Sequence, residues 1–95
     1  MLNGITHKKH FIPGDASYKF RRDYILVGNN DFLLIFDKNG KFISEINAKG
    51  GGPDEYKQIS DFDLLPDKDE IVICTDKRMA FFSLDGHFIE KKAIP

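Results

Sequence analysis

Residues 70–89, EIVICTDKRMAFFSLDGHFI, decide the fold, because residues 24–43, YILVGNNDFLLIFDKNGKFI, repeat their pattern. The two stretches align without a gap at a constant offset of 46 residues. Apolar positions match: Ile25 with Ile71, Leu26 with Val72, Val27 with Ile73, Ile35 with Phe81, Phe36 with Phe82, Phe42 with Phe88 and Ile43 with Ile89. Turn positions match as well: Asn30 with Asp76, Asn39 with Asp85 and Gly40 with Gly86. The chain therefore contains two copies of one unit.

Each copy is predicted to form four short β-strands, because its segments are rich in Ile, Val and Phe and end at turn residues. We expect strands at 17–21, 24–27, 32–37 and 41–46 in the first copy and at 61–65, 70–75, 79–84 and 87–92 in the second. The turns DKNG (37–40) and SLDG (83–86) end in Gly after Asn or Asp, residues that tolerate the positive φ of a hairpin. Four strands in a repeat of about 40–50 residues are the pattern of a β-propeller blade.

The middle strands carry unbroken apolar runs, FLLIF at 32–36 and MAFF at 79–82. A strand with one wet face would alternate, so these runs predict cover on both faces, as between stacked blades. We expect the following residues to form the core of the repeat: Ile35, Phe36, Phe42, Phe81, Phe82 and Phe88.

A glycine-rich connector, KGGGPDEY at 49–56, joins the two copies. A phosphate-binding glycine loop should open a helix and end in Gly-Lys-Ser or Gly-Lys-Thr, and this one does neither. We therefore predict a structural loop between two blades, in which the glycines let the backbone pass close to the neighbouring blade and the tyrosine anchors the loop. The loop residues are Gly50, Gly51, Gly52, Pro53, Glu55 and Tyr56.

The length and composition fit one small folded domain. We divide the 95 residues into a poorly ordered segment at 1–14, a first blade-like repeat at 15–50 and a second at 51–95. A net charge of −1 without a basic excess argues against a nucleic-acid partner. No segment approaches the roughly 18 apolar residues of a membrane helix, so we expect no membrane span. The single cysteine, Cys74, is expected to be a small buried apolar residue without an internal disulfide.

Candidate chemistry is sparse, and we expect no catalytic, cofactor-binding or metal-binding residue and no cofactor. HKKH at 7–10 places His7 and His10 three residues apart, but no helix signal or third ligand accompanies them. DKNG holds only a fragment of a calcium loop, without its closing Glu. His87 follows a turn and is expected to be exposed. The recurring Asp61 and Asp76 fall at strand ends, where such side chains commonly accept bonds from backbone amides.

The second copy with its connector resembles the six-bladed β-propeller proteins of Bacteroides-type bacteria, which are relatives of NHL-repeat proteins. The resemblance covers roughly 24–95, and it rests on Gly52, Pro53, Glu55 and Tyr56 of the loop, on Asp61–Phe62 and on FSLDGHFI at 82–89. Asp54 departs from it, because the family usually has Gly there. The resemblance implies an all-β fold of two consecutive four-stranded antiparallel blades, which form an incomplete ring.

Two blades cannot close a ring, because propellers have about 4–8 blades. Three explanations stay open: the chain is a piece of a longer propeller protein, copies of the chain assemble with one another, or the fold is a different one, such as a small open barrel. The expected partners are accordingly the missing blades of the same protein or further copies of the chain. No signal peptide is visible, so the compartment is not determined. The resemblance implies export for full-length relatives, which fits a missing N-terminal segment better than a cytoplasmic location.

The first functional hypothesis is a non-enzymatic binding scaffold for a protein or glycan ligand, with the site among the loops at 28–31, 49–56 and 74–78. The alternative is part of a propeller enzyme, a metal-dependent lyase or lactonase whose remaining blades are missing. Stoichiometric calcium or zinc in pure protein would favour the enzyme.

Overall fold

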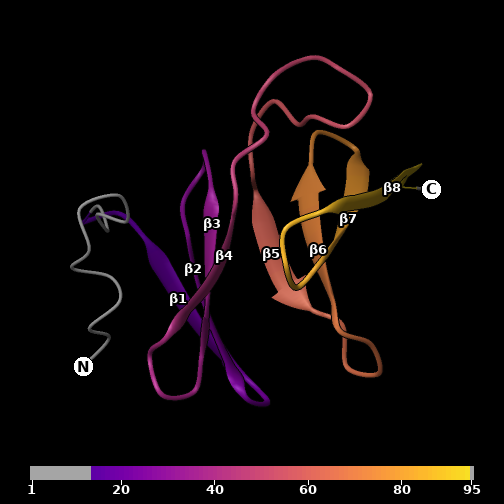
Figure 1. The fold of residues 1–95 in the computed structure, drawn as a ribbon. Coiled ribbons are helices and arrows are strands. Elements are labelled where there is room, and N and C mark those ends of the chain that lie inside the picture. The colour runs from indigo at the N-terminus through magenta and orange to yellow at the C-terminus, as the bar shows by residue number, and fades with distance from the viewer. Residues whose placement is uncertain (1–13, 95) are drawn as a thin grey trace.

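The fold is all-β, as predicted, and consists of two four-stranded antiparallel sheets that stand side by side (Figure 1). The computed structural model describes residues 14–94. The first sheet contains β1 (Ser17–Arg21), β2 (Tyr24–Gly28), β3 (Leu33–Asp37) and β4 (Phe42–Ile46). The second contains β5 (Asp61–Leu64), β6 (Glu70–Thr75), β7 (Arg78–Ser83) and β8 (Phe88–Ala93). The sheets are open and do not close into a ring.

The strands follow the chain in order within each sheet, and the two sheets match in detail. Every neighbouring pair is antiparallel. Each sheet has a register shift at the same place of the repeat, between Ile35 and Phe36 in β3 and between Phe81 and Phe82 in β7. The predicted strands shift by at most one residue at either end. Phe36 and Phe82 lie in corresponding strands, which the repeat requires.

The turns include the two predicted glycines and two residues that the sequence did not reveal. Gly40 has φ of 86° and Gly86 has φ of 90°, as expected after Asn39 and Asp85. Arg22 and Lys77 also have positive φ, 51° and 59°. Both lie in two-residue hairpin loops, Arg22 as the first residue between the paired positions Arg21 and Tyr24, and Lys77 as the second residue between Thr75 and Arg78. So short a reversal commonly needs a positive φ, whatever the residue.

The main core lies between the two sheets. Fully buried residues of the first sheet, Leu26, Leu33, Ile35 and Ile46, pack there with Phe62, Leu64, Ile71, Ile73, Ala80 and Phe82 of the second. A smaller cluster of Ile25, Val27, Leu34 and Phe36 lies on the opposite face of the first sheet. The predicted cover on both faces therefore exists for the middle strands of the first sheet. In the second sheet, burial alternates instead.

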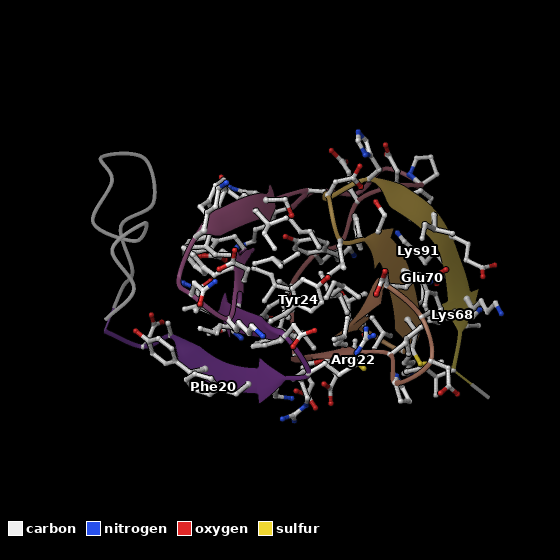
Figure 2. All side chains as sticks on the ribbon, turned by 60° about the horizontal axis from the view of Figure 1, so that its bottom comes forward. Phe20, Arg22, Tyr24, Lys68, Glu70 and Lys91 are labelled. Atoms are coloured by element: carbon white, nitrogen blue, oxygen red, sulfur yellow. The ribbon has the colours of Figure 1, made fainter. Side chains whose placement is uncertain are left out.

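Polar contacts join the sheets through β1 and β5, the first strand of each sheet. Lys19 Nζ donates to Asp61 Oδ1 at 2.8 Å, and Arg21 Nε donates to Asp63 Oδ1 at 2.7 Å. Arg22 donates to the carbonyl of Lys68 at 2.8 Å. Figure 2 shows Arg22 at the junction of the two sheets. These bonds run from cations of the first sheet to acceptors of the second, so the two faces that meet are complementary and different.

Candidate functional site: the loop end

Three connections gather at one end of the molecule, the upper end in Figure 1, which we call the loop end. They are residues 29–32 between β2 and β3, residues 47–60 between β4 and β5, and residues 76–77 between β6 and β7. The amide of Asn30 donates to the carbonyl of Ile59 at 3.0 Å, and the backbone N–H of Ile59 donates back to Asn30 at 2.8 Å. Asn30, Lys57 and Asp76 from the three connections also line one hollow, so the three connections are neighbours in space.

The glycine-rich connector is held together by Glu55. Its carboxylate accepts the backbone N–H of Gly52 at 2.7 Å, and its own N–H donates to the carbonyl of Gly52 at 3.1 Å. A Cβ on Gly50 would lie 2.4 Å from Glu55 Oε1, and one on Gly52 would lie 2.9 Å from it. These two glycines therefore make room for a side chain of their own loop, and the close approach to the neighbouring blade that was expected of them stays a prediction. Gly51 has nothing within 4 Å of such a Cβ.

Tyr56 anchors the connector to the first sheet. Its side chain is 2% exposed. The single proton of the hydroxyl lies between two acceptors, the carbonyl oxygens of Asp31 at 2.8 Å and of Ile46 at 3.2 Å, and the hydroxyl oxygen accepts the N–H of Ala48 at 3.2 Å. Burial raises the pKa of this phenol to about 12, even though the Ala48 N–H favours the ionised form. Its chemistry is consequently that of a neutral structural tyrosine.

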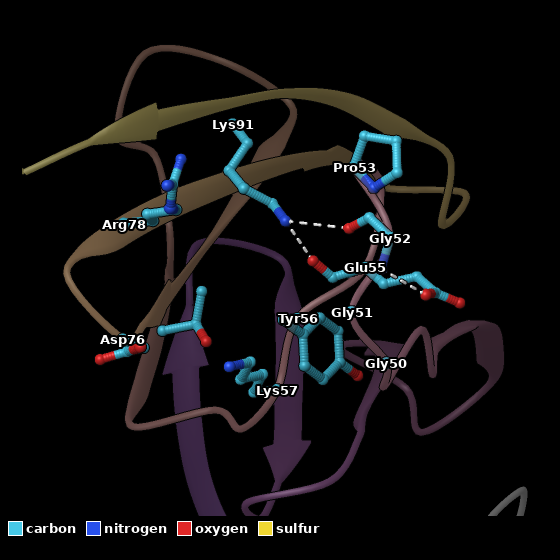
Figure 3. Close-up of a pocket in the computed structure, with 11 residues that line it drawn as sticks. Gly50, Gly51, Gly52, Pro53, Glu55, Tyr56, Lys57, Asp76, Arg78 and Lys91 are labelled. Atoms are coloured by element: carbon cyan, nitrogen blue, oxygen red, sulfur yellow. Dashed lines mark hydrogen bonds between the residues drawn. The ribbon is translucent and has the colours of Figure 1, made fainter.

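A cavity of about 530 Å³ opens between this connector and the second sheet. Figure 3 shows its lining residues, which are Gly50, Gly51, Gly52, Pro53, Glu55, Tyr56, Lys57, Thr75, Asp76, Arg78 and Lys91. All six residues of the predicted loop belong to this lining. A second hollow of about 660 Å³ shares Lys57, Thr75 and Asp76 with it. Together they make the loop end a concave surface.

Lys91 from β8 crosses over the connector. Its ammonium donates to the carbonyl of Gly52 at 3.5 Å and, at shorter distance, to that of Glu55 (Figure 3). Arg78 and Asp76 stand on the other side of the cavity, at the hairpin between β6 and β7. Arg78 lies within the predicted loop at 74–78, whereas sequence reasoning missed Lys57 and Lys91, which lie outside the three predicted loops. The repeat alignment offered one signal, since Lys91 falls on Glu45 of the first copy and reverses its charge.

The predicted core residues differ in their burial. Ile35, Phe36 and Phe82 are buried, Phe42 and Phe81 are half-buried, and Phe88 is 36% exposed. The rings of Phe36 and Phe42 meet edge to face at 5.7 Å, and those of Phe82 and Phe88 meet in the same way at 5.7 Å. The repeat is therefore preserved in its aromatic contacts.

The other candidates lie apart from the loop end or outside the described part of the chain. His7 and His10 lie outside the described residues. His87 is exposed, as expected, and contacts Asp85 at 3.0 Å at the opposite end. Within residues 14–94, no group of three or more His, Cys, Asp or Glu side chains could hold a metal ion. Asp61 accepts the N–H of Phe62 at 2.8 Å, the backbone role expected of it.

Cys74 is half-buried, and burial raises the pKa of its thiol, so the protonated and less nucleophilic form is favoured. No helix in the described part of the chain is long and apolar enough to span a membrane.

Comparisons with known proteins agree with the two-sheet architecture. The crystal structure of a "putative exported protein" from Bacteroides fragilis superposes with a TM-score of 0.76 at 23% sequence identity. The match covers 95% of this chain and 27% of that one, so the chain spans about a quarter of the length of that protein. No curated protein matches the sequence significantly. A family profile described as a 6-bladed beta-propeller, DUF5128, matches residues 14–95, and the chain therefore belongs to this family of six-bladed propellers.

Proposed function

We propose that the chain supplies two adjacent blades of a six-bladed propeller and that its loop end binds a ligand without chemical conversion. The observation that carries this proposal is the cavity of about 530 Å³ between the connector and the second blade. Concave polar surfaces built from loops on a rigid sheet scaffold are where binding sites concentrate. The blades supply the rigid part, and the connector supplies most of the wall.

The residues of the cavity support binding over catalysis. General acid–base chemistry on a ligand requires two positioned groups that can exchange protons. The carboxylate of Glu55 is already engaged by the N–H of Gly52, and Tyr56 is held in a buried hydrogen-bond network. Among the described lining residues, Asp76 is the remaining carboxylate. One exposed carboxylate among cations suits recognition better than a lyase or lactonase reaction.

We propose further blades of a longer propeller protein as the partner, in preference to copies of this chain. Ion pairs join β1 to β5 through Lys19 with Asp61 and Arg21 with Asp63. In a ring of copies, the second blade of one chain would meet the first blade of the next. The strand pairing places β1 on β5 at an offset of 44 residues, because Phe20 and Leu64 pair with the equivalent residues Ile25 and Ile71. A ring of copies then brings Asp63 against Ser17, and Leu65 against Lys19. Neither pair is ionic, so a self-assembled ring loses the contacts that join these two blades.

The mass in solution tests this choice of partner. Three chains of two blades would complete a ring of six, so a self-assembled ring would be a trimer. We expect light scattering on the purified 95-residue chain to show no discrete trimer. A stable trimer that survives raised salt would contradict the proposal. We also propose export for the full-length protein, on the strength of the Bacteroides fragilis neighbour.

Ligand binding is tested on glycan and peptide arrays with two matched double variants. Lys57→Ala with Asp76→Ala changes the loop end, and Lys41→Ala with Asp67→Ala removes the same charges from hairpins at the opposite end. We expect a saturable array signal that the first variant loses and the second keeps. Equal loss in both variants, or no signal on either array, would overturn the binding function. Stoichiometric calcium or zinc together with lactone hydrolysis would favour the enzyme instead.

A further inference from the structure

The charges around the loop-end cavity favour an anion. Lys57, Arg78 and Lys91 face it with Glu55 and Asp76, which gives the lining a formal charge of +1. The whole chain has a formal charge of −1. The cavity therefore carries positive charge on a chain that is slightly acidic overall.

Two of the three cations are available to a ligand. Lys91 is held by the carbonyls of Gly52 and Glu55, which fixes its ammonium at the cavity wall. Arg78 and Lys57 make no ion pair or side-chain hydrogen bond with any residue between 14 and 94. Arg78 is on a strand, and its planar guanidinium suits bidentate contact with a carboxylate.

Thr75 supplies an independent observation. The residue is 5% exposed and lines both hollows of the loop end. Its hydroxyl has no hydrogen-bond partner among the described residues, whereas the other buried polar side chain, Ser44, donates to the carbonyl of Leu84 at 2.6 Å. A buried hydroxyl without a partner costs stability. At the wall of a cavity, it is a group that a polar ligand can satisfy.

The first blade is an internal control for these residues. The repeat places Thr75 on Asn29, Asp76 on Asn30, Arg78 on Phe32 and Lys91 on Glu45. A blade therefore forms without Thr, Asp, Arg and Lys at these positions. The set belongs to the second blade alone, so blade architecture does not account for it.

We propose that this cavity binds a small ligand that carries a carboxylate next to hydroxyl groups. Arg78 and Lys57 hold the carboxylate, and Lys91 adds its field from the wall. The Thr75 hydroxyl and the Asp76 carboxylate bond the ligand's hydroxyl groups. A lining charge of +1 matches one carboxylate, whereas the carboxylates of Glu55 and Asp76 would repel a phosphate dianion. This inference rests on the proposed binding function and names the class of ligand.

The test titrates the purified chain with glucuronate and, separately, with its uncharged methyl ester and with inorganic phosphate. Amide chemical shifts and calorimetry report binding. We expect glucuronate to shift amides at 50–57 and 74–78, and to bind at least about tenfold more tightly than the ester, as charge-assisted bonds predict. Added salt should weaken binding by glucuronate and leave the ester unaffected.

Three variants make the test specific. Arg78→Gln should weaken glucuronate binding about tenfold or more, while Lys92→Gln, one residue from Lys91 on β8, should leave it unchanged. Thr75→Val should weaken binding yet raise the urea midpoint, because it removes a buried hydroxyl that has no protein partner. A purely structural Thr75 would instead lower the midpoint when replaced.

The outcomes separate this inference from the function on which it rests. Equal binding of acid and ester at the loop end overturns the anion preference and keeps the binding function. Tighter binding of phosphate than of glucuronate, or equal effects of Arg78→Gln and Lys92→Gln, overturns the inference as well. No shift with any of the three ligands also overturns it, and the arrays then decide the binding function separately.

Discussion

The two blades have the same strand order, the same register shifts and the same aromatic pairs, yet their middle strands are buried differently. In the first blade, β2 is buried from Ile25 to Gly28 and β3 from Leu33 to Phe36. In the second, β6 alternates between buried and half-buried residues, and β7 alternates along most of its length. Equivalent strands thus differ in burial because their surroundings differ.

The difference lies on one face of the second blade. Its residues that point to the first blade are buried, whereas Val72, Cys74, Met79 and Phe81 on the other face are half-buried. The ammonium of Lys92 lies over the Phe81 ring at 5.6 Å, at the position where the first blade has the buried Ile46. An apolar run in a blade sequence therefore reports the neighbours that the complete ring provides.

Replacing Phe82 and Phe81 one at a time should give the largest difference in stability between the two faces of the second blade. Phe82→Ala removes a side chain from the core between the blades and should lower the free energy of unfolding by about 3–5 kcal/mol. Phe81→Ala removes a half-buried ring and should cost about 1 kcal/mol. Urea denaturation of both variants measures the two values. Equal costs would mean that both faces of the second blade are closed.

Removing the Tyr56 hydroxyl tests how the second blade is attached to the first. Tyr56→Phe leaves the carbonyls of Asp31 and Ile46 without this donor and should cost about 1–3 kcal/mol. Tyr18→Phe, at a hydroxyl on a half-exposed side chain, is the matched control and should change stability by less than about 0.5 kcal/mol. If Tyr56→Phe left the free energy of unfolding unchanged, packing of the ring alone would hold the connector.

The same tyrosine predicts an alkaline transition. Its pKa in the folded chain is about 12, above its ordinary value of 10.0, so its contribution is complete below pH 10 and is lost as the pH rises toward 12. The Tyr56→Phe variant should show a flatter fall in urea midpoint over this window. Parallel curves for the two proteins would contradict the linkage.

Gly86 offers a smaller test at the contact between the blades. Its φ of 90° disfavours a side chain, and a Cβ would lie 3.1 Å from the carbonyl oxygen of Glu45 in the first blade. Gly86→Ala should cost about 1–2 kcal/mol from backbone strain. Gly51→Ala, with open space around it, should cost less. Thermal unfolding of the pair gives the comparison.

The ion pairs between β1 and β5 should contribute least to the free energy of unfolding. Asp61→Asn and Asp63→Asn should each cost about 0.2–1 kcal/mol, because these pairs are partly exposed and are screened by salt. The Lys19 bond to Asp61 lowers the pKa of that carboxyl. Burial opposes ionisation of Asp63, but the bond from Arg21 and the Leu64 N–H outweigh it, and the pKa is lowered.

Acid should therefore weaken the same contacts. Because both pKa values are lowered by folding, the stabilisation is complete above the ordinary value of 3.8 and is lost as the pH falls below it. The double variant Asp61→Asn with Asp63→Asn should reduce the acid dependence of the urea midpoint. If the urea midpoint of the double variant fell with decreasing pH as steeply as that of the unmodified chain, other carboxylates would be responsible for the acid sensitivity.

The sequence predicted the fold well because repetition and strand pattern are local signals. Matching apolar residues such as Phe36 and Phe82 located the strands to within one residue at either end. The turn residues Arg22 and Lys77 were missed, because their positive φ follows from hairpin length and not from residue type. The cavity was predicted in part: Arg78 lies in the predicted loop at 74–78, but Lys91, which is on β8, meets the connector only after the sheet has formed.

Tyr56 is encoded with the second blade, but its hydroxyl bonds to carbonyls of the first. The junction between these two blades is consequently completed by a residue that precedes the second blade in the sequence. A duplication of residues 49–94 as one segment would keep Tyr56 together with the blade that follows it. A segment boundary between Tyr56 and Asp61 would separate the tyrosine from that blade, so engineered propellers of altered blade number should be joined immediately before Lys49.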